Sequence, residues 1–190
     1  MKRHVEKYIR ELITHVSNLP VGKIEVLANK ILEILLSNGV IYIVGNGGSA
    51  ATASHFVCDL NKTVLGKDTT SSKKKRLKVI CLSDNIPLLT AWANDVSYDY
   101  VFSEPLKNFI NKNDLLIVIT GSGNSKNIVN ALKVAKEVGA YTFGILGFEG
   151  GLAKDIADDS IIVTTNHYGH IEDTHMILIH LITDYLQKLF

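Results

Sequence analysis

The sequence predicts an α/β protein built on a flavodoxin-like, doubly wound parallel sheet of five strands, with two leading N-terminal helices. Short β-branched runs alternate with helical patterns along most of the chain, which is typical of successive βαβ units. The strand-like runs are almost continuously apolar, as expected of a parallel sheet covered by helices on both faces. Because 190 residues suit one ordinary core, we expect residues 1–190 to form a single domain.

The two leading helices come first in chain order. Apolar residues at helical spacing over residues 5–16 indicate the first helix, which should end at Asn18-Leu19-Pro20. The second should run over residues 21–37 and end at Asn38-Gly39, a favourable C-terminal stop. The alternation then predicts strands at 40–44, 77–82, 115–119, 141–146 and 160–164, separated by helices at 49–61, 86–93, 125–138, 151–157 and 170–189.

Composition argues against several classes of partner. Twenty basic residues against nineteen acidic ones leave a net charge of +1, so no overall field favours a nucleic acid or an anionic membrane. The apolar run at 176–182 is far shorter than the ~20 residues that cross a bilayer, and the N-terminus lacks a signal-peptide core. Cys58 and Cys81 have no CxxC spacing, which favours reduced thiols. We therefore expect a cytoplasmic protein with no nucleic-acid or membrane partner.

One basic run, Lys73-Lys74-Lys75-Arg76, departs from this balance of charge. It follows the polar residues 67–72, so an exposed, solvated loop is the favoured interpretation. A clamp for an anionic ligand is the alternative.

Two lean loops follow predicted strands: Gly45-Asn46-Gly47-Gly48-Ser49 and TGSGNS, residues 120–125. Each taken alone could equally be an ordinary tight turn before a helix. Together they favour an anion site, because glycine lets the backbone approach a ligand and helix N-termini attract negative charge. Hydroxyl groups would add hydrogen bonds from Ser49, Thr120, Ser122 and Ser125. The pattern is neither GxxxxGK[ST] nor GxGxxG, so a small phosphomonoester is favoured over a nucleoside triphosphate or dinucleotide.

Histidines and carboxylates recur at helical spacing in two places. His55 and Asp59 share one face of the helix that follows the first loop. Glu172, His175 and His180 stay on broadly the same side of the last helix, where an apolar setting obliges a histidine to find partners. Two histidines and two carboxylates could hold a divalent metal such as zinc, or serve as acid and base. Spacing does not choose between these, and any one of them alone is more simply a core or surface side chain.

Four stretches carry a resemblance to a known family: GNGGSA with the following SHF, SDNIPLLTAWANDVSYDYVFSEPL, GSGNSKNIVNALKVAKEVGA and GILGFEGG. In this order, and over essentially the whole chain, they resemble the sugar isomerase (SIS) domain proteins, most closely the bacterial phosphoheptose isomerases. The resemblance implies one SIS domain that converts sedoheptulose 7-phosphate to D-glycero-D-manno-heptose 7-phosphate through an enediol. It also implies a homotetramer with active sites between subunits and one zinc ion per subunit.

The resemblance also implies roles for individual residues. Phosphate binding falls on Ser49, Thr120, Ser122 and Ser125, with backbone help from Gly47 and Gly48. Sugar contacts fall on Asn46, Asp95 and Glu172. The metal and acid/base pattern falls on His55, Asp59, Glu172 and His180, of which Asp59 and His180 are the candidates for catalytic proton transfer.

Three positions depart from the family pattern. The family normally has Glu at position 59, Gln at position 172 and a threonine where Gly121 stands. Aspartate is one methylene shorter than glutamate, and a misplacement of about 1 Å can cost ~10²-fold in rate. Two alternatives therefore stay open: a non-catalytic SIS protein that binds a phosphosugar or another protein, and an isomerase of a different sugar phosphate. Retention of a carboxylate at 59 and a histidine at 180 favours the enzyme.

Overall fold

The computed structural model describes residues 1–67, 70 and 75–189 and contains one five-stranded sheet in the order β2-β1-β3-β4-β5. Every strand pair is parallel. The strands are β1 (Val40–Gly45), β2 (Lys78–Cys81), β3 (Leu115–Thr120), β4 (Tyr141–Gly147) and β5 (Asp159–Val163). The predicted doubly wound sheet is confirmed, and each predicted strand end lies within one residue of the observed end.

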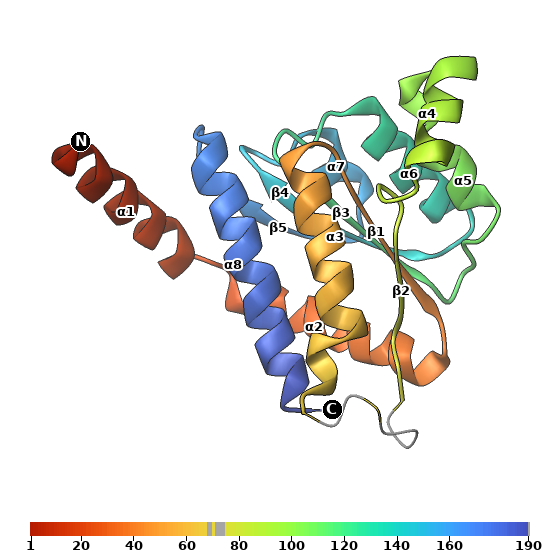
Figure 1. The fold of residues 1–190 in the computed structure, drawn as a ribbon, viewed down its shortest axis with the longest axis horizontal. Helices are drawn as coiled ribbons and strands as arrows, with labels where there is room; N and C mark the ends of the chain where they lie inside the picture. The colour runs from red at the N-terminus through yellow and green to blue at the C-terminus, as the bar shows by residue number, and fades with distance from the viewer. Residues whose placement is uncertain (68–69, 71–74, 190) are drawn as a thin grey trace.

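The helices cover both faces of this sheet (Figure 1). They are α1 (Lys2–Ser17), α2 (Val21–Ser37), α3 (Gly48–Asn61), α4 (Ile86–Asp95), α5 (Ser103–Lys107), α6 (Lys126–Glu137), α7 (Gly151–Ile156) and α8 (Tyr168–Gln187), with short 3-10 turns η1 (Thr63–Leu65) and η2 (Tyr98–Tyr100). Helices α2, α3 and α8 bury their apolar residues on one face, and α5, α6 and α7 bury theirs on the other. The sequence did not predict α5, η1 or η2.

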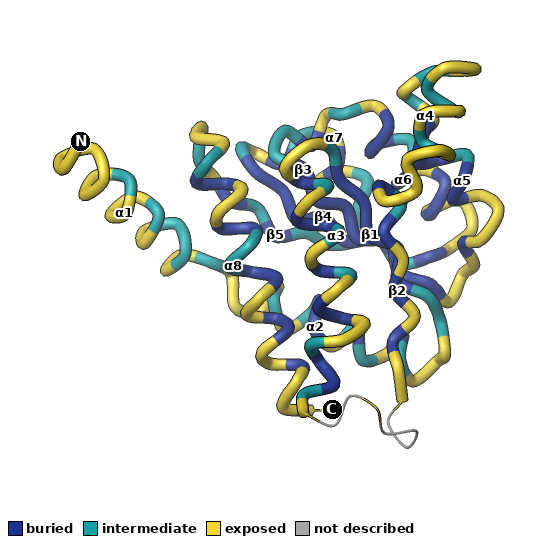
Figure 2. Tube along the Cα trace, in the orientation of Figure 1, coloured by how far each residue is buried: buried dark blue, intermediate teal, exposed yellow. Residues whose placement is uncertain are grey.

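Burial on both faces explains why the sequences of the central strands are continuously apolar. All six residues of β3 are buried, and its side chains alternate between the two cores. Ile117 packs in the α2/α3/α8 core, whereas Val118 packs in the α5/α6/α7 core. Figure 2 shows the central strands β1, β3 and β4 almost entirely in the colour of buried residues. Since helices cover both faces of the sheet, side chains on either face are buried, and both faces are therefore apolar.

Helix α1 contributes to neither core. It has no buried residue and extends away from the body of the molecule (Figure 1). Its contact with the body is near the start of α8, where the Tyr8 hydroxyl donates to Asp173 Oδ2 at 2.6 Å. That hydrogen bond raises the pKa of Tyr8 to about 12. Val5, Ile9 and Ile13 are left exposed on this helix.

Two other sequence expectations concern charge and membranes. Lys73 and Lys74 of the basic run lie outside the described residues, so the interpretation of that run as a solvated loop stays a prediction. Among the described helices, none has the length and apolar character needed to span a bilayer.

Candidate functional site

The two lean loops meet at one edge of the sheet. The strand order reverses between β1 and β3, and open α/β sheets bind ligands at the carboxyl ends of strands at such a switch point. A cavity of about 150 Å³ lies there, lined by Asn46, Ser49, Thr120, Gly121, Ser122, Ser125, Tyr168 and Glu172. We call it the switch-point pocket. The structure thus brings together six of the predicted loop and helix residues and adds Tyr168 and Gly121.

Two helix N-termini face this pocket without a side-chain cap. Helix α3 starts after Gly47 and α6 after Ser125, and neither residue caps its helix through a side chain. By contrast, Asn85 caps α4 and His167 caps α8. Uncapped N–H groups and the helix dipole favour an anion at both ends. The pocket therefore has the backbone chemistry of a phosphate site.

Gly47 and Gly48 shape the first loop in different ways. Gly47 has φ +53°, which glycine adopts without strain, and a Cβ there would meet open space. Gly48 lies against Glu172: a Cβ on Gly48 would stand 2.6 Å from Glu172 Oε1. The Glu172 carboxylate therefore lies beside the start of α3, in the switch-point pocket.

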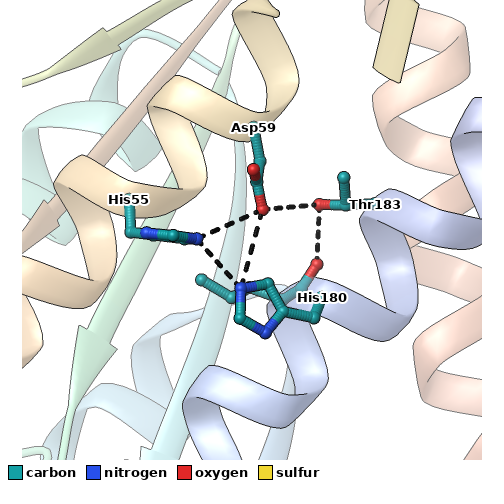
Figure 3. A network of polar contacts seen from close by, with 5 residues as sticks. His55, Asp59, His180 and Thr183 are labelled. Atoms are coloured by element: carbon teal, nitrogen blue, oxygen red, sulfur yellow. Dashed lines mark hydrogen bonds and ion pairs between the residues drawn. The ribbon is translucent and has the colours of Figure 1, made fainter. Parts of the chain in front are cut away.

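A second group of polar side chains lies further along α3 and α8. His180 Nε2 is 2.9 Å from His55 Nε2, and Asp59 Oδ2 is 3.6 Å from His55 Nε2 and 4.0 Å from His180 Nε2. Figure 3 shows the three side chains pointing toward one another from the two helices. We call this set the His-Asp-His group.

Glu172 does not join the His-Asp-His group within the chain. Among the described residues, the only set of three or more possible metal ligands is His55, Asp59 and His180. Glu172 precedes His180 by two helical turns, about 12 Å along α8 at 1.5 Å per residue. The expectation of a four-residue ligand set including Glu172 is thus not met inside one chain, because the two residues lie at different heights on the same helix.

Asp59 is the buried member of the group. The residue is 6% exposed, while the side chains of His55 and His180 are about half exposed. Thr183 approaches Asp59 Oδ2 at 3.4 Å, but it also donates to Ile179 O at 2.8 Å, and a hydroxyl has only one proton to donate. A buried carboxylate with such long contacts is open to a cation or to a substrate proton. Sequence reasoning missed Thr183, which has no motif to mark it.

The donor set fits zinc. Two imidazole nitrogens and one carboxylate oxygen are the ligand types of catalytic zinc sites that keep a fourth position open. Ligand atoms of a tetrahedral zinc ion lie about 3.3 Å apart, given bond lengths of about 2.0–2.1 Å. The separations of 2.9, 3.6 and 4.0 Å bracket that value. Two Nε2 atoms facing each other also suit a shared cation.

His175 and Asp95 lie apart from both sites. His175 is buried, and its Nε2 lies 3.0 Å from Leu146 O; burial lowers the pKa of His175 to about 4, so the ring is neutral. Asp95 is exposed at the end of α4, where its Oδ1 accepts from Asn94 Nδ2 and it borders a different cavity with Trp92. The structure does not bring Asp95 to the switch-point pocket of its own chain.

The fold and site define a class of protein: a doubly wound α/β protein with a polar pocket at its switch point. The sequence profile of the SIS domain matches residues 5–147. A probable phosphoheptose isomerase of Thermoplasma acidophilum is 35% identical over 97% of this chain and 98% of that protein, so the chain belongs to the SIS domain family.

Other relatives extend this likeness. A phosphoheptose isomerase of Aliarcobacter butzleri is 40% identical over 82% of this chain and 79% of that protein. Among solved structures, a phosphoheptose isomerase of Neisseria gonorrhoeae has 27% sequence identity and a TM-score of 0.87, with 98% of each chain covered. The likeness therefore includes α8, which lies beyond the part matched by the family profile.

Proposed function

We propose that the protein is an aldose–ketose isomerase that converts sedoheptulose 7-phosphate to D-glycero-D-manno-heptose 7-phosphate. Relatives that match nearly the whole chain are named phosphoheptose isomerases. The observation that supports it best is the arrangement of two sites along one pair of helices. Ser49 and Glu172 border the switch-point pocket near the starts of α3 and α8, and the His-Asp-His group lies further along both.

This arrangement suits an extended phosphosugar. His55 follows Ser49 by about 9 Å along α3, at 1.5 Å per residue. A ligand whose phosphate occupies the switch-point pocket can therefore direct the other end of its carbon chain toward Asp59 and His180. Ser49, Thr120, Ser122 and Ser125 would hold the phosphate oxygens, together with the N-termini of α3 and α6.

The reaction needs a proton to leave one carbon and return to its neighbour. A positioned base takes the proton, an enediol forms, and the proton returns to the adjacent carbon, while a second group moves protons between the two oxygens. Asp59 and His180 are our candidates for these roles. The buried, loosely contacted carboxylate of Asp59 suits proton transfer at carbon, and the half-exposed imidazole of His180 suits the exchange at oxygen.

We further propose one zinc ion in each subunit, held by His55, Asp59 and His180. Coordination would make Asp59 and His180 weaker bases, so their metal-binding and proton-transfer roles compete. Bound there, the ion would polarise the sugar carbonyl and stabilise the negative charge that develops on oxygen. Removal of metal with a chelator should lower kcat, and addition of zinc should restore it. Full activity in metal-free protein would contradict a catalytic ion.

A homotetramer with active sites between subunits completes the proposal. Apolar side chains are exposed on α1 and around α4, and surfaces of this kind are typical of interfaces between chains. They include Val5, Ile9, Ile13, Ile86, Leu88 and Val96. Assembly through these helices would bring Asp95 to the switch-point pocket of a neighbouring subunit. It would likewise bring Glu172 to the His-Asp-His group of a neighbouring subunit.

The test is a coupled isomerase assay of the zinc-loaded protein on sedoheptulose 7-phosphate, with ribose 5-phosphate, fructose 6-phosphate and arabinose 5-phosphate beside it. We expect turnover confined to the heptulose. Turnover of another sugar instead would keep the reaction class and overturn the substrate. Binding of phosphosugar without turnover of any of the four would favour the non-catalytic alternative.

A further inference from the structure

A closed pair of amides fixes the orientation of Asn46 in the switch-point pocket. Asn46 Nδ2 donates to Asn127 Oδ1 at 2.9 Å, and Asn127 Nδ2 donates back to Asn46 Oδ1 at 3.0 Å. The Tyr98 hydroxyl also donates to Asn46 Oδ1, at 3.0 Å. Asn46 therefore touches α6 and η2 while its own loop follows β1.

The main chain sets the polarity of this pair. The backbone N–H of Ile128 can only donate, and it donates to Asn127 Oδ1 at 2.9 Å. This contact assigns the Asn127 oxygen and therefore directs its NH₂ group toward Asn46 Oδ1. Asn46 Oδ1 then faces two donors, and one of the two Nδ2 protons of Asn46 is committed to Asn127. The second Nδ2 proton is what Asn46 has left to offer a ligand.

We infer that Asn127 is a positioning residue for the reaction: it holds Asn46 so that Asn46 presents a hydrogen-bond donor to the bound sugar phosphate. The inference rests on the proposed function for its substrate and assigns Asn127 no contact with that substrate. Asn127 is 2% exposed and is absent from the lining of the switch-point pocket. An oxygen-rich, anionic ligand is matched by a donor and would be repelled by the amide oxygen.

Placement on α6 gives Asn127 a further consequence. The residue lies in the first turn of the helix whose start carries Ser125, so the same turn supports a phosphate-binding hydroxyl and the Asn46 amide. Side chains thereby link the loop after β1 to the first turn of α6, across the point where the strand order reverses. This link keeps the two halves of the anion site in register.

A double-mutant cycle tests the inference, with kcat/KM for sedoheptulose 7-phosphate as the readout. We expect Asn127→Leu to lower kcat/KM about tenfold, the effect of losing one well-placed hydrogen bond. In an Asn46→Ala background, Asn127→Leu should change kcat/KM by less than about twofold, because its effect passes through Asn46. Equal losses in both backgrounds would show a merely structural role and overturn the inference.

The matched control is Asn61→Leu, which also removes an amide that joins two elements, since Asn61 Nδ2 donates to Val79 O at 3.0 Å. It should leave kcat/KM within about twofold of the parent. Thermal unfolding of each variant checks that the fold persists.

A second measurement separates failure of this inference from failure of the proposed function. The side-chain NH₂ signals of Asn46 in a ¹⁵N NMR spectrum, assigned by their loss in Asn46→Ala, should shift in Asn127→Leu and stay in place in Asn61→Leu. Unmoved signals in Asn127→Leu would refute the amide pair even if the isomerase is active. Shifted signals with no turnover of any sugar phosphate by the wild type would support the positioning and reject the reaction.

Discussion

At the scale of single residues, burial distinguishes the members of the His-Asp-His group. Asp59 is withdrawn from water while the two imidazoles are half exposed, so the carboxylate is the group whose removal changes the site most. The resemblance to phosphoheptose isomerases implies Glu at this position, where this chain has Asp. The structure places Asp59 Oδ2 3.6 Å from His55 Nε2 and 4.0 Å from His180 Nε2, with the carboxylate directed toward both imidazoles (Figure 3).

Asp59→Asn should lower kcat by about 10²–10⁴-fold, the usual contribution of a positioned acid or base, because the amide keeps the shape and cannot accept the proton. KM should change little. Steady-state kinetics measure both. The control is Glu33→Gln on α2, whose exposed carboxylate pairs with Lys30 and should be silent. An Asp59→Asn variant with kcat within tenfold of the wild type would show that Asp59 does not carry out the proton transfer.

His175 predicts a pH dependence of stability. Its pKa is lowered to about 4 by burial, so between about pH 6.5 and pH 4 the unfolded chain binds a proton there and the folded protein does not. The free energy of unfolding should therefore fall as pH drops through that range, by up to about 3 kcal/mol from this residue. Above about pH 6.5 the effect vanishes.

Urea unfolding at pH 7 and pH 5 measures this dependence. His175→Gln keeps a donor for Leu146 O and removes the titration, so its stability should change less between the two pH values than that of the wild type. Burial also lowers the pKa of His170, which contributes in the same direction in both proteins and cancels in the comparison. Equal pH dependence in the two proteins would assign the effect elsewhere.

At the scale of elements, the sequence predicted what depends on local pattern. The strand positions could be predicted because central parallel strands are apolar on both faces. The lean loops could be predicted because tight turns and anion sites need glycine. The sequence did not predict contacts between residues that are far apart in the chain. The amide pair of Asn46 with Asn127 and the approach of Thr183 to Asp59 join residues through space. Neither spacing nor residue type indicates such contacts.

Two glycines in the site loops should respond differently to the same change. Gly123 has φ +67°, and a Cβ there would stand 1.9 Å from the backbone oxygen of Gly150, so Gly123→Ala should destabilise the fold severely. At Gly48 the obstacle is the end of the Glu172 side chain, which can move. Gly48→Ala should fold, with a raised KM.

Thermal unfolding and kinetics together test this contrast. Adding Glu172→Ala to Gly48→Ala relieves the clash, so the double variant should be at least as stable as Gly48→Ala. A Gly123→Ala protein as stable as the wild type would show that the β3 and β4 loops are not packed as described.

At the scale of the whole molecule, the sheet is covered by helices of its own chain, whereas the apolar face of α1 is not covered. The sheet has both faces covered, whereas α1 extends outward with Val5, Ile9 and Ile13 exposed (Figures 1 and 2). These three residues recur at one-turn spacing and form an apolar stripe. The stripe supports the proposed assembly because an isolated apolar helix face gains most by packing against other chains.

If α1 packs in the proposed tetramer, Ile9→Asp combined with Ile13→Asp should dissociate it into smaller species, since the change would bury two carboxylates in the proposed interface. Sedimentation velocity measures the outcome. Lys7→Asp, on the opposite side of the helix, changes charge without entering the stripe and should leave assembly intact. A tetramer that survives both aspartates would show that α1 does not hold it together.

Proton exchange with solvent tests the assignment of the chemistry to Asp59 and His180 most directly. The protein would be incubated with sedoheptulose 7-phosphate in D₂O, and deuterium at C1 of the recovered ketose would be followed by NMR. An enediol formed by a solvent-exchanging base predicts deuterium at C1 with the wild type and a loss of incorporation of at least about 10²-fold with Asp59→Asn. Incorporation by Asp59→Asn at the wild-type rate would contradict the assignment.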